Sequence, residues 1–106
     1  MTIHPIRKLP SDLDRVAQFI RAIDSKVRIH ILYLLHDKPR CVHELVSVLG
    51  SSQPLVSQHL KVLKKAGLVA AERRGREIFY SLSSIDVIPI LDSVSTLVHG
   101  DMKTIV

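Results

Sequence analysis

Two short amphipathic segments, 42–49 and 53–65, are separated by only three residues, Gly50 and two serines. Gly50 can adopt the left-handed backbone conformation that ends a helix, and either serine can cap the helix that follows. Pro54 then lies in the first turn of the second helix, where its missing N–H costs no hydrogen bond. The pattern predicts a helix-turn-helix over residues 42–65.

Two strand-like runs, 68–71 and 78–82, follow directly after the second helix. They contain β-branched and aromatic residues, and Gly75 lies among charged residues between them, which is typical of a β-hairpin. A helix-turn-helix followed at once by a basic hairpin is the arrangement of a winged helix. We therefore predict a wing over residues 68–82.

The remaining segments fit a single domain over residues 1–106. A chain of 106 residues is long enough for one hydrophobic core and short for two. We expect an N-terminal arm over 1–10, where two prolines discourage a helix, two helices within 11–36, and a last helix over 86–102. The predicted fold class is mainly α, a winged helix-turn-helix with five helices and a two-stranded β-hairpin wing.

The positive charge of the chain is concentrated in one quarter of its length. The net charge is +5, and residues 51–76 carry the whole excess. A concentrated cationic surface attracts a polyanion by counterion release, which indicates nucleic acid. Glutamine and serine can contact bases, whereas lysine and arginine can neutralise phosphates. The predicted DNA-binding residues are Gln53, Ser57, Gln58, His59, Lys61, Lys64, Arg73, Arg74 and Arg76.

His59 has two interpretations. It belongs to the second helix of the helix-turn-helix and could contact a base or a phosphate. It also neighbours Leu60, at the edge of the predicted core, and could be a packed histidine instead. The sequence leaves both open.

Several classes of protein are excluded by what the sequence lacks. No apolar run approaches the roughly 20 residues of a membrane span, and the N-terminus has no secretory pattern. The single cysteine, Cys41, cannot form an intramolecular disulfide and suits the cytoplasm. No catalytic motif is apparent, and only four aromatic residues could line a substrate pocket. We expect a cytoplasmic protein that is not an enzyme and has no membrane partner.

Three stretches together resemble the ArsR/SmtB family of bacterial transcriptional repressors. They are residues 41–46 (CVHELV), 52–69 (SQPLVSQHLKVLKKAGLV) and 72–82 (ERRGREIFYSL). The resemblance implies a homodimeric winged helix that binds an inverted repeat in operator DNA and is released by an inducer, often a metal ion. It also implies that the major groove is faced by Gln53, Ser57, Gln58 and His59, with the wing arginines at its flanks.

The resemblance further suggests two places for metal ligands. Cys41 and His43 stand where the family often carries Cys-Val-Cys. On the last helix, only Asp86 and His99 match the four-ligand pattern of zinc-sensing members. Thiolate, imidazole and carboxylate can all bind Zn²⁺ or a similar divalent ion. Alternatively, Cys41 packs as a small hydrophobe and Asp86 caps the last helix.

The last helix is apolar on much of its circumference, more than a 106-residue monomer can bury. We therefore expect a homodimer formed through the terminal helices. The predicted interface residues are Val87, Ile90, Leu91, Val94, Leu97 and Val98.

These observations predict a repressor that binds double-stranded operator DNA as a dimer and is released by an effector, first among candidates a metal ion such as zinc. One alternative is a metal-independent regulator, either constitutive or responsive to oxidation of Cys41. Another is a winged-helix module that binds proteins and has lost DNA binding. The basic wing argues against that module.

Overall fold

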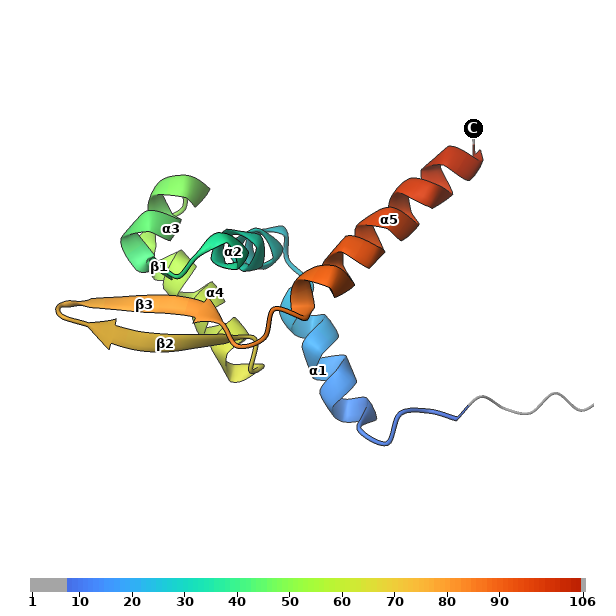
Figure 1. Ribbon diagram of the computed structural model, residues 1–106, viewed down its shortest axis with the longest axis horizontal. Helices are drawn as coiled ribbons and strands as arrows, with labels where there is room; N and C mark the ends of the chain where they lie inside the picture. Colours follow the sequence, from blue (N-terminus) through green and yellow to red (C-terminus); the bar gives the residue numbers. More distant parts are fainter. Residues whose placement is uncertain (1–7, 106) are drawn as a thin grey trace, which may run out of the picture.

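The computed structural model describes residues 8–105, with side chains as far as residue 99. Residues 1–7 of the predicted N-terminal arm lie outside the described residues. Within the described part, five helices and three strands follow one another along the chain (Figure 1). Their bounds are α1 Leu13–Ile23, α2 Lys26–Asp37, β1 Arg40–Cys41, α3 Val42–Leu49, α4 Gln53–Lys65, β2 Val69–Arg74, β3 Glu77–Leu82 and α5 Val87–Ile105.

Local side-chain and backbone signals fix the ends of the helices. Ser25 Oγ accepts a hydrogen bond from the N–H of Arg28 at 3.2 Å and caps α2. Ser52 Oγ accepts one from the N–H of Leu55 at 3.4 Å and caps α4. Gly50 ends α3 with a φ of 65°, in the left-handed region that favours glycine. The helices α3 and α4 therefore have the bounds that the sequence predicts.

The hydrophobic core lies between α2, α3, α4, the sheet and the first turns of α5. Burial of such side chains contributes about 1.5–3 kcal/mol each. The residues with the least exposure are Ile31, Leu32, Leu45, Val56, Leu60 and Leu63.

The buried face of α5 corrects part of the predicted dimer interface. Val87 and Leu91 are only 4% and 6% exposed within the protomer, and Ile88 is buried beside them. They belong to the protomer's own core rather than to a surface that a second copy could cover. A helix that is apolar on most of its circumference does not reveal from its sequence which stripe faces its own core.

The sheet has three antiparallel strands in the order β1-β3-β2, one more than the predicted hairpin. In β1, Arg40 pairs with Tyr80 and Cys41 pairs with Phe79. A two-residue strand has no periodicity, and Pro39 before it indicates a turn, so the sequence pattern does not predict it.

The β2–β3 hairpin is longer, and its turn shorter, than predicted. Arg73 pairs with Ile78 and Arg74 with Glu77, which leaves Gly75 and its neighbour as the turn. Gly75 has a φ of 66° and supplies the left-handed residue. Thus Arg73 and Arg74 lie on the strand β2 and not in the connection between the predicted strands 68–71 and 78–82.

The β2–β3 hairpin and α5 project from opposite sides of the protein (Figure 1). The first turns of α5 are held by the core, and the hydroxyl of Tyr33 on α2 donates to Asp92 Oδ1 at 2.6 Å. Although α5 has 19 residues, no helix among residues 8–105 combines the length and the apolar composition of a membrane span.

Candidate nucleic-acid interface

Helix α4 presents one apolar and one polar face. Val56, Leu60 and Leu63 are buried in the core and fix the rotation of the helix about its axis. With about 100° between successive residues, this rotation turns the opposite side toward solvent. The exposed polar side chains include Gln53, Ser57, Gln58, Lys61 and Lys64, all of them predicted DNA contacts, and Lys65 in the last turn is exposed as well.

The side chain of His59 takes a different direction from this polar face. It is half-buried, and its Nδ1 lies 3.2 Å from Nη1 of Arg28 on α2. Burial, followed by the nearby charge of Arg28, lowers the pKa of His59. Of the two interpretations left open by the sequence, the structure supports the packed histidine, which corrects the assignment of His59 to the DNA-binding surface. Sequence reasoning missed Arg28, whose contact with His59 spans 31 positions of the chain.

The three wing arginines are all exposed, but their surroundings differ. The guanidinium of Arg74 lies over the ring of Phe79, 4.8 Å from its centroid, and Nη2 is 3.5 Å from Glu72 Oε2. Within the described residues, neither Arg73 nor Arg76 forms an ion pair or a cation–π contact. Two of the three guanidiniums are therefore available to an external anion, while the third is partly engaged within the wing.

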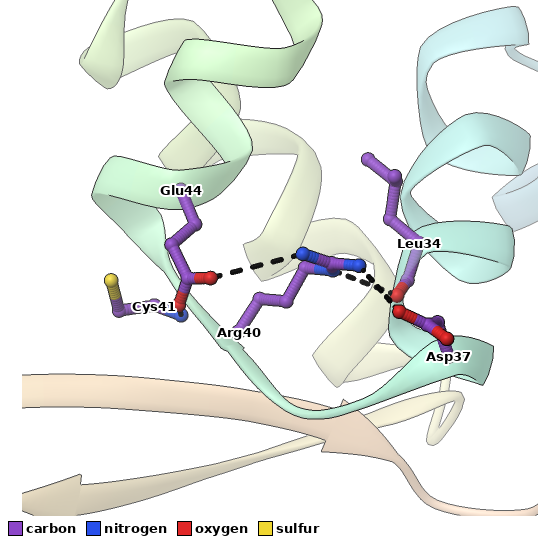
Figure 2. Close-up of polar contacts among 5 residues, drawn as sticks. All are labelled: Leu34, Asp37, Arg40, Cys41 and Glu44. Atoms are coloured by element: carbon purple, nitrogen blue, oxygen red, sulfur yellow. Dashed lines mark hydrogen bonds and ion pairs between the residues drawn. The ribbon is translucent and has the colours of Figure 1, made fainter.

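The residues around Cys41 form a structural network rather than an open metal site (Figure 2). The N–H of Cys41 donates to Glu44 Oε1 at 3.2 Å, which caps α3. Arg40 lies on the other side of this carboxylate: its Nη1 is 3.8 Å from Glu44 Oε2, and its Nη2 donates to Asp37 at 2.9 Å. Nε of Arg40 donates to the carbonyl of Leu34 at 3.0 Å. The network ties the end of α2 to the start of α3.

This network lowers the pKa of Glu44, and the two candidate metal ligands beside it differ in exposure. The hydrogen bond from the N–H of Cys41 is the main cause that lowers the pKa of Glu44. Cys41 is 6% exposed, whereas His43 is exposed to solvent. In the part of the chain that the structure describes, no three His, Cys, Asp or Glu side chains gather closely enough to hold a metal ion. Among the side chains of residues 8–99, Cys41 and His43 therefore belong to no ligand cluster of a single protomer.

Asp86 and His99 mark the two ends of the predicted ligand pattern on α5. Asp86 immediately precedes the helix, and its N–H donates to Ser84 Oγ at 3.2 Å. At 1.5 Å per residue, thirteen positions along a helix span about 20 Å. One protomer therefore cannot bring both side chains to the same ion. Both are exposed, so they remain accessible to a second copy.

The terminal helices expose apolar side chains that the protomer does not cover. On α5, the exposed fractions are 47% for Ile90, 48% for Val94, 64% for Leu97 and 52% for Val98. Three apolar side chains of α1 are exposed as well. They are Leu13, Val16 and Ile20. These side chains are the available surface for a dimer contact.

Comparison with known proteins gives consistent results. A family model described as bacterial regulatory protein, arsR family, matches residues 25–71. The HTH-type transcriptional repressor SmtB of Mycobacterium tuberculosis is 50% identical over 84 residues, which are 78% of this chain and 62% of that protein. The chain therefore spans less than two thirds of that relative. Rv0081 of the same organism, an uncharacterized HTH-type transcriptional regulator, is 40% identical over 76 residues, which are 71% of this chain and 67% of that protein.

Solved structures agree with this relationship. The crystal structure of Rv0081 matches with a TM-score of 0.78 at 32% identity, covering 90% of this chain and 97% of the other. A homodimeric winged helix-turn-helix DNA-binding domain from Mycobacterium bovis, a possible ArsR-family transcriptional regulator, matches with a TM-score of 0.77 at 29% identity, covering 90% and 93%. The chain therefore belongs to the ArsR family, a family of winged-helix transcriptional regulators rather than enzymes, as its sequence predicts.

Proposed function

We propose that this chain is a transcriptional repressor that binds an inverted repeat in double-stranded operator DNA as a homodimer. The observation that carries the proposal is the exposed polar and cationic face of α4, continued by Arg73 and Arg76 on the wing. Glutamine side chains on this face can bond base edges, and the cations can neutralise phosphates. Such a protein acts in the cytoplasm, where its operator lies.

The homodimer is supported by the apolar side chains that α1 and α5 expose. The homodimeric M. bovis domain has the same fold. Two-fold symmetry would place two copies of α4 about 34 Å apart, one turn of the double helix. An inverted repeat with half-sites one turn apart is the DNA that matches this spacing.

The effector is the finer part of the proposal. The family resemblance favours a divalent metal such as zinc. Asp86 of one protomer and His99 of the other would hold the ion between two paired α5 helices. These two residues are half of a four-ligand set, and Cys41 and Glu44 serve the α3 cap. The donors therefore do not fit a closed zinc site, so we propose release by a metal-independent effector and keep a divalent metal as the alternative.

Selection of DNA from a random duplex library tests the proposal. We expect enrichment of an inverted repeat and an affinity that falls steeply with salt, by a slope of about 0.9 per neutralised phosphate. A scrambled duplex of the same composition is the control. A chain that enriches no sequence and binds duplex without salt dependence would favour the protein-interaction module instead.

A further inference from the structure

Arg28 joins three helices through a single guanidinium. Its Nε donates to the carbonyl of Ala22 at 2.6 Å, and its Nη2 donates to the carbonyl of Arg21 at 3.2 Å. Both carbonyls belong to the last turn of α1, and that of Arg21 also accepts a hydrogen bond from the N–H of Asp24 at 3.4 Å. The third nitrogen, Nη1, lies 3.2 Å from Nδ1 of His59 on α4. Arg28 itself is on α2, so the side chain links α1, α2 and α4.

His59 connects this link to the DNA-binding face. It follows Gln58 directly and lies about 100° further around α4, beside the buried Leu60. A rotation or shift of α4 that moves Gln58 or Lys61 therefore moves His59 as well. The buried Leu60 helps to fix the rotation of α4, but its apolar contacts set no particular distance or angle to the end of α1. The hydrogen bond to Arg28 adds a directional restraint.

We propose that Arg28 is a positioning residue for α4, holding the helix against the end of α1 through Nδ1 of His59 so that its polar face meets the major groove in one orientation. The inference rests on the proposed function, since it concerns how the DNA-binding face is oriented. An arginine suits this role because its planar guanidinium presents donors in several fixed directions, which a lysine ammonium does not.

The arrangement also fixes the protonation state of His59. Arginine has no acceptor, so Nδ1 must accept the hydrogen bond and the ring must be neutral, with its proton on Nε2. A second proton removes the acceptor and places two cations side by side. Arg28 on α2 is the only charged group among the described residues whose field lowers the pKa of His59, in addition to burial.

Protonation therefore gives opposite results under two mechanisms. If His59 acted only as one more cation near DNA, its protonation would strengthen binding. If it positions α4 through Arg28, its protonation weakens binding to the selected operator while binding to a scrambled duplex weakens less. The sign of the pH effect that His59 contributes distinguishes the two.

The test compares two substitutions with matched controls in the full-length chain. Arg28→Met removes the donors but keeps an apolar stem, and Lys26→Met removes an equal charge from an exposed position of the same helix. His59→Asn keeps an acceptor oxygen near the place of Nδ1 but cannot be protonated, and His30→Asn is its exposed control. Affinity for the selected operator and for a scrambled duplex is measured from pH 5.5 to pH 8, with thermal melting of each variant.

We expect Arg28→Met to lower the operator-to-scrambled affinity ratio about tenfold more than Lys26→Met at pH 8. His59→Asn should retain most of that ratio at pH 8 and lose less of it at pH 5.5 than the wild type or His30→Asn. Equal effects of Arg28→Met and Lys26→Met, or a ratio that rises at pH 5.5 through His59, would overturn the proposal. If Arg28→Met does not fold, the pH profiles of His59→Asn and His30→Asn decide by the same criteria.

A second readout needs no DNA. The imidazole of His59 is titrated by NMR in the wild type and in Arg28→Lys, which keeps the charge but not the fork of donors. We expect the pKa of His59 to rise in the variant, and an unchanged titration would reject the contact. If the wild type selects no DNA but the pKa of His59 rises in Arg28→Lys, the proposed function is rejected and the Arg28–His59 contact stands.

Discussion

The unequal surroundings of the wing arginines give a quantitative prediction. Arg76 lies in the turn of the hairpin, whereas Arg74 is 3.5 Å from Glu72 and stacked over Phe79. A guanidinium that neutralises one phosphate contributes about 0.9 to the slope of log affinity against log salt. Between 50 and 200 mM salt this is a factor of about 3.5 per protomer and about 12 per dimer.

We therefore expect Arg76→Ala to reduce the salt slope of the dimer by about 1.8, corresponding to two lost phosphate contacts. Arg74→Ala should reduce it by less than half as much, because Glu72 already offsets part of the charge of Arg74. Fluorescence anisotropy with the selected operator between 50 and 200 mM salt measures both slopes, and Lys26→Ala is the control for loss of an exposed charge. Equal reductions for Arg74 and Arg76 would show that Arg74 leaves Glu72 and Phe79 when DNA binds, and our reasoning about the wing would be wrong.

Three further predictions concern the interface, the α3 cap and the effector. Val94→Asp should give a folded monomer, because it places a charge on the exposed apolar face of α5; sedimentation that still shows a dimer would place the interface elsewhere. Glu44→Gln should reduce the loss of stability in acid, because the hydrogen bond from the N–H of Cys41 lowers the pKa of Glu44. The stability that this carboxylate contributes is complete above the unfolded pKa near 4.5 and is lost as pH falls through the lower folded value. Thermal melts of the variant and the wild type from pH 6 to pH 3 measure the difference. Equimolar zinc should leave operator affinity unchanged, because Asp86 and His99 supply only half of a ligand set; a loss of affinity that His99→Ala abolishes would establish a metal effector.

The sequence predicts those parts of the fold that depend on neighbours along the chain. Gly50, the serine at 52 and Pro54 define the turn between α3 and α4 within a few positions, so the bounds of both helices agree with the structure. The strand β1 does not depend on neighbours along the chain, because its two residues acquire their conformation by pairing with Tyr80 and Phe79. It is therefore not predicted.

The candidate site is predictable to the same extent. The polar stripe of α4 follows from helical periodicity, and the structure leaves each of its five members exposed. The periodicity also indicates that His59 lies at the edge of this stripe, but it cannot show that Arg28 comes from another helix to meet it. Likewise, α5 is apolar on most of its circumference, so its sequence does not show which side is buried. Val87 and Leu91 could therefore not be assigned to the core before the packing was known.

The packing of α2 suggests how a dimer contact and a DNA contact can affect each other. On one side, Tyr33 of α2 donates to Asp92 of α5 at 2.6 Å, next to the exposed Val94. On the other side, Arg28 of the same helix meets His59 of α4. Between them, Ile31 and Leu32 are fully buried, so α2 cannot shift without disturbing the core. An effector that changes the pairing of two α5 helices would therefore reach the DNA-binding face through one rigid helix, and a coupling of about 3 kcal/mol would be enough to change operator affinity about a hundredfold.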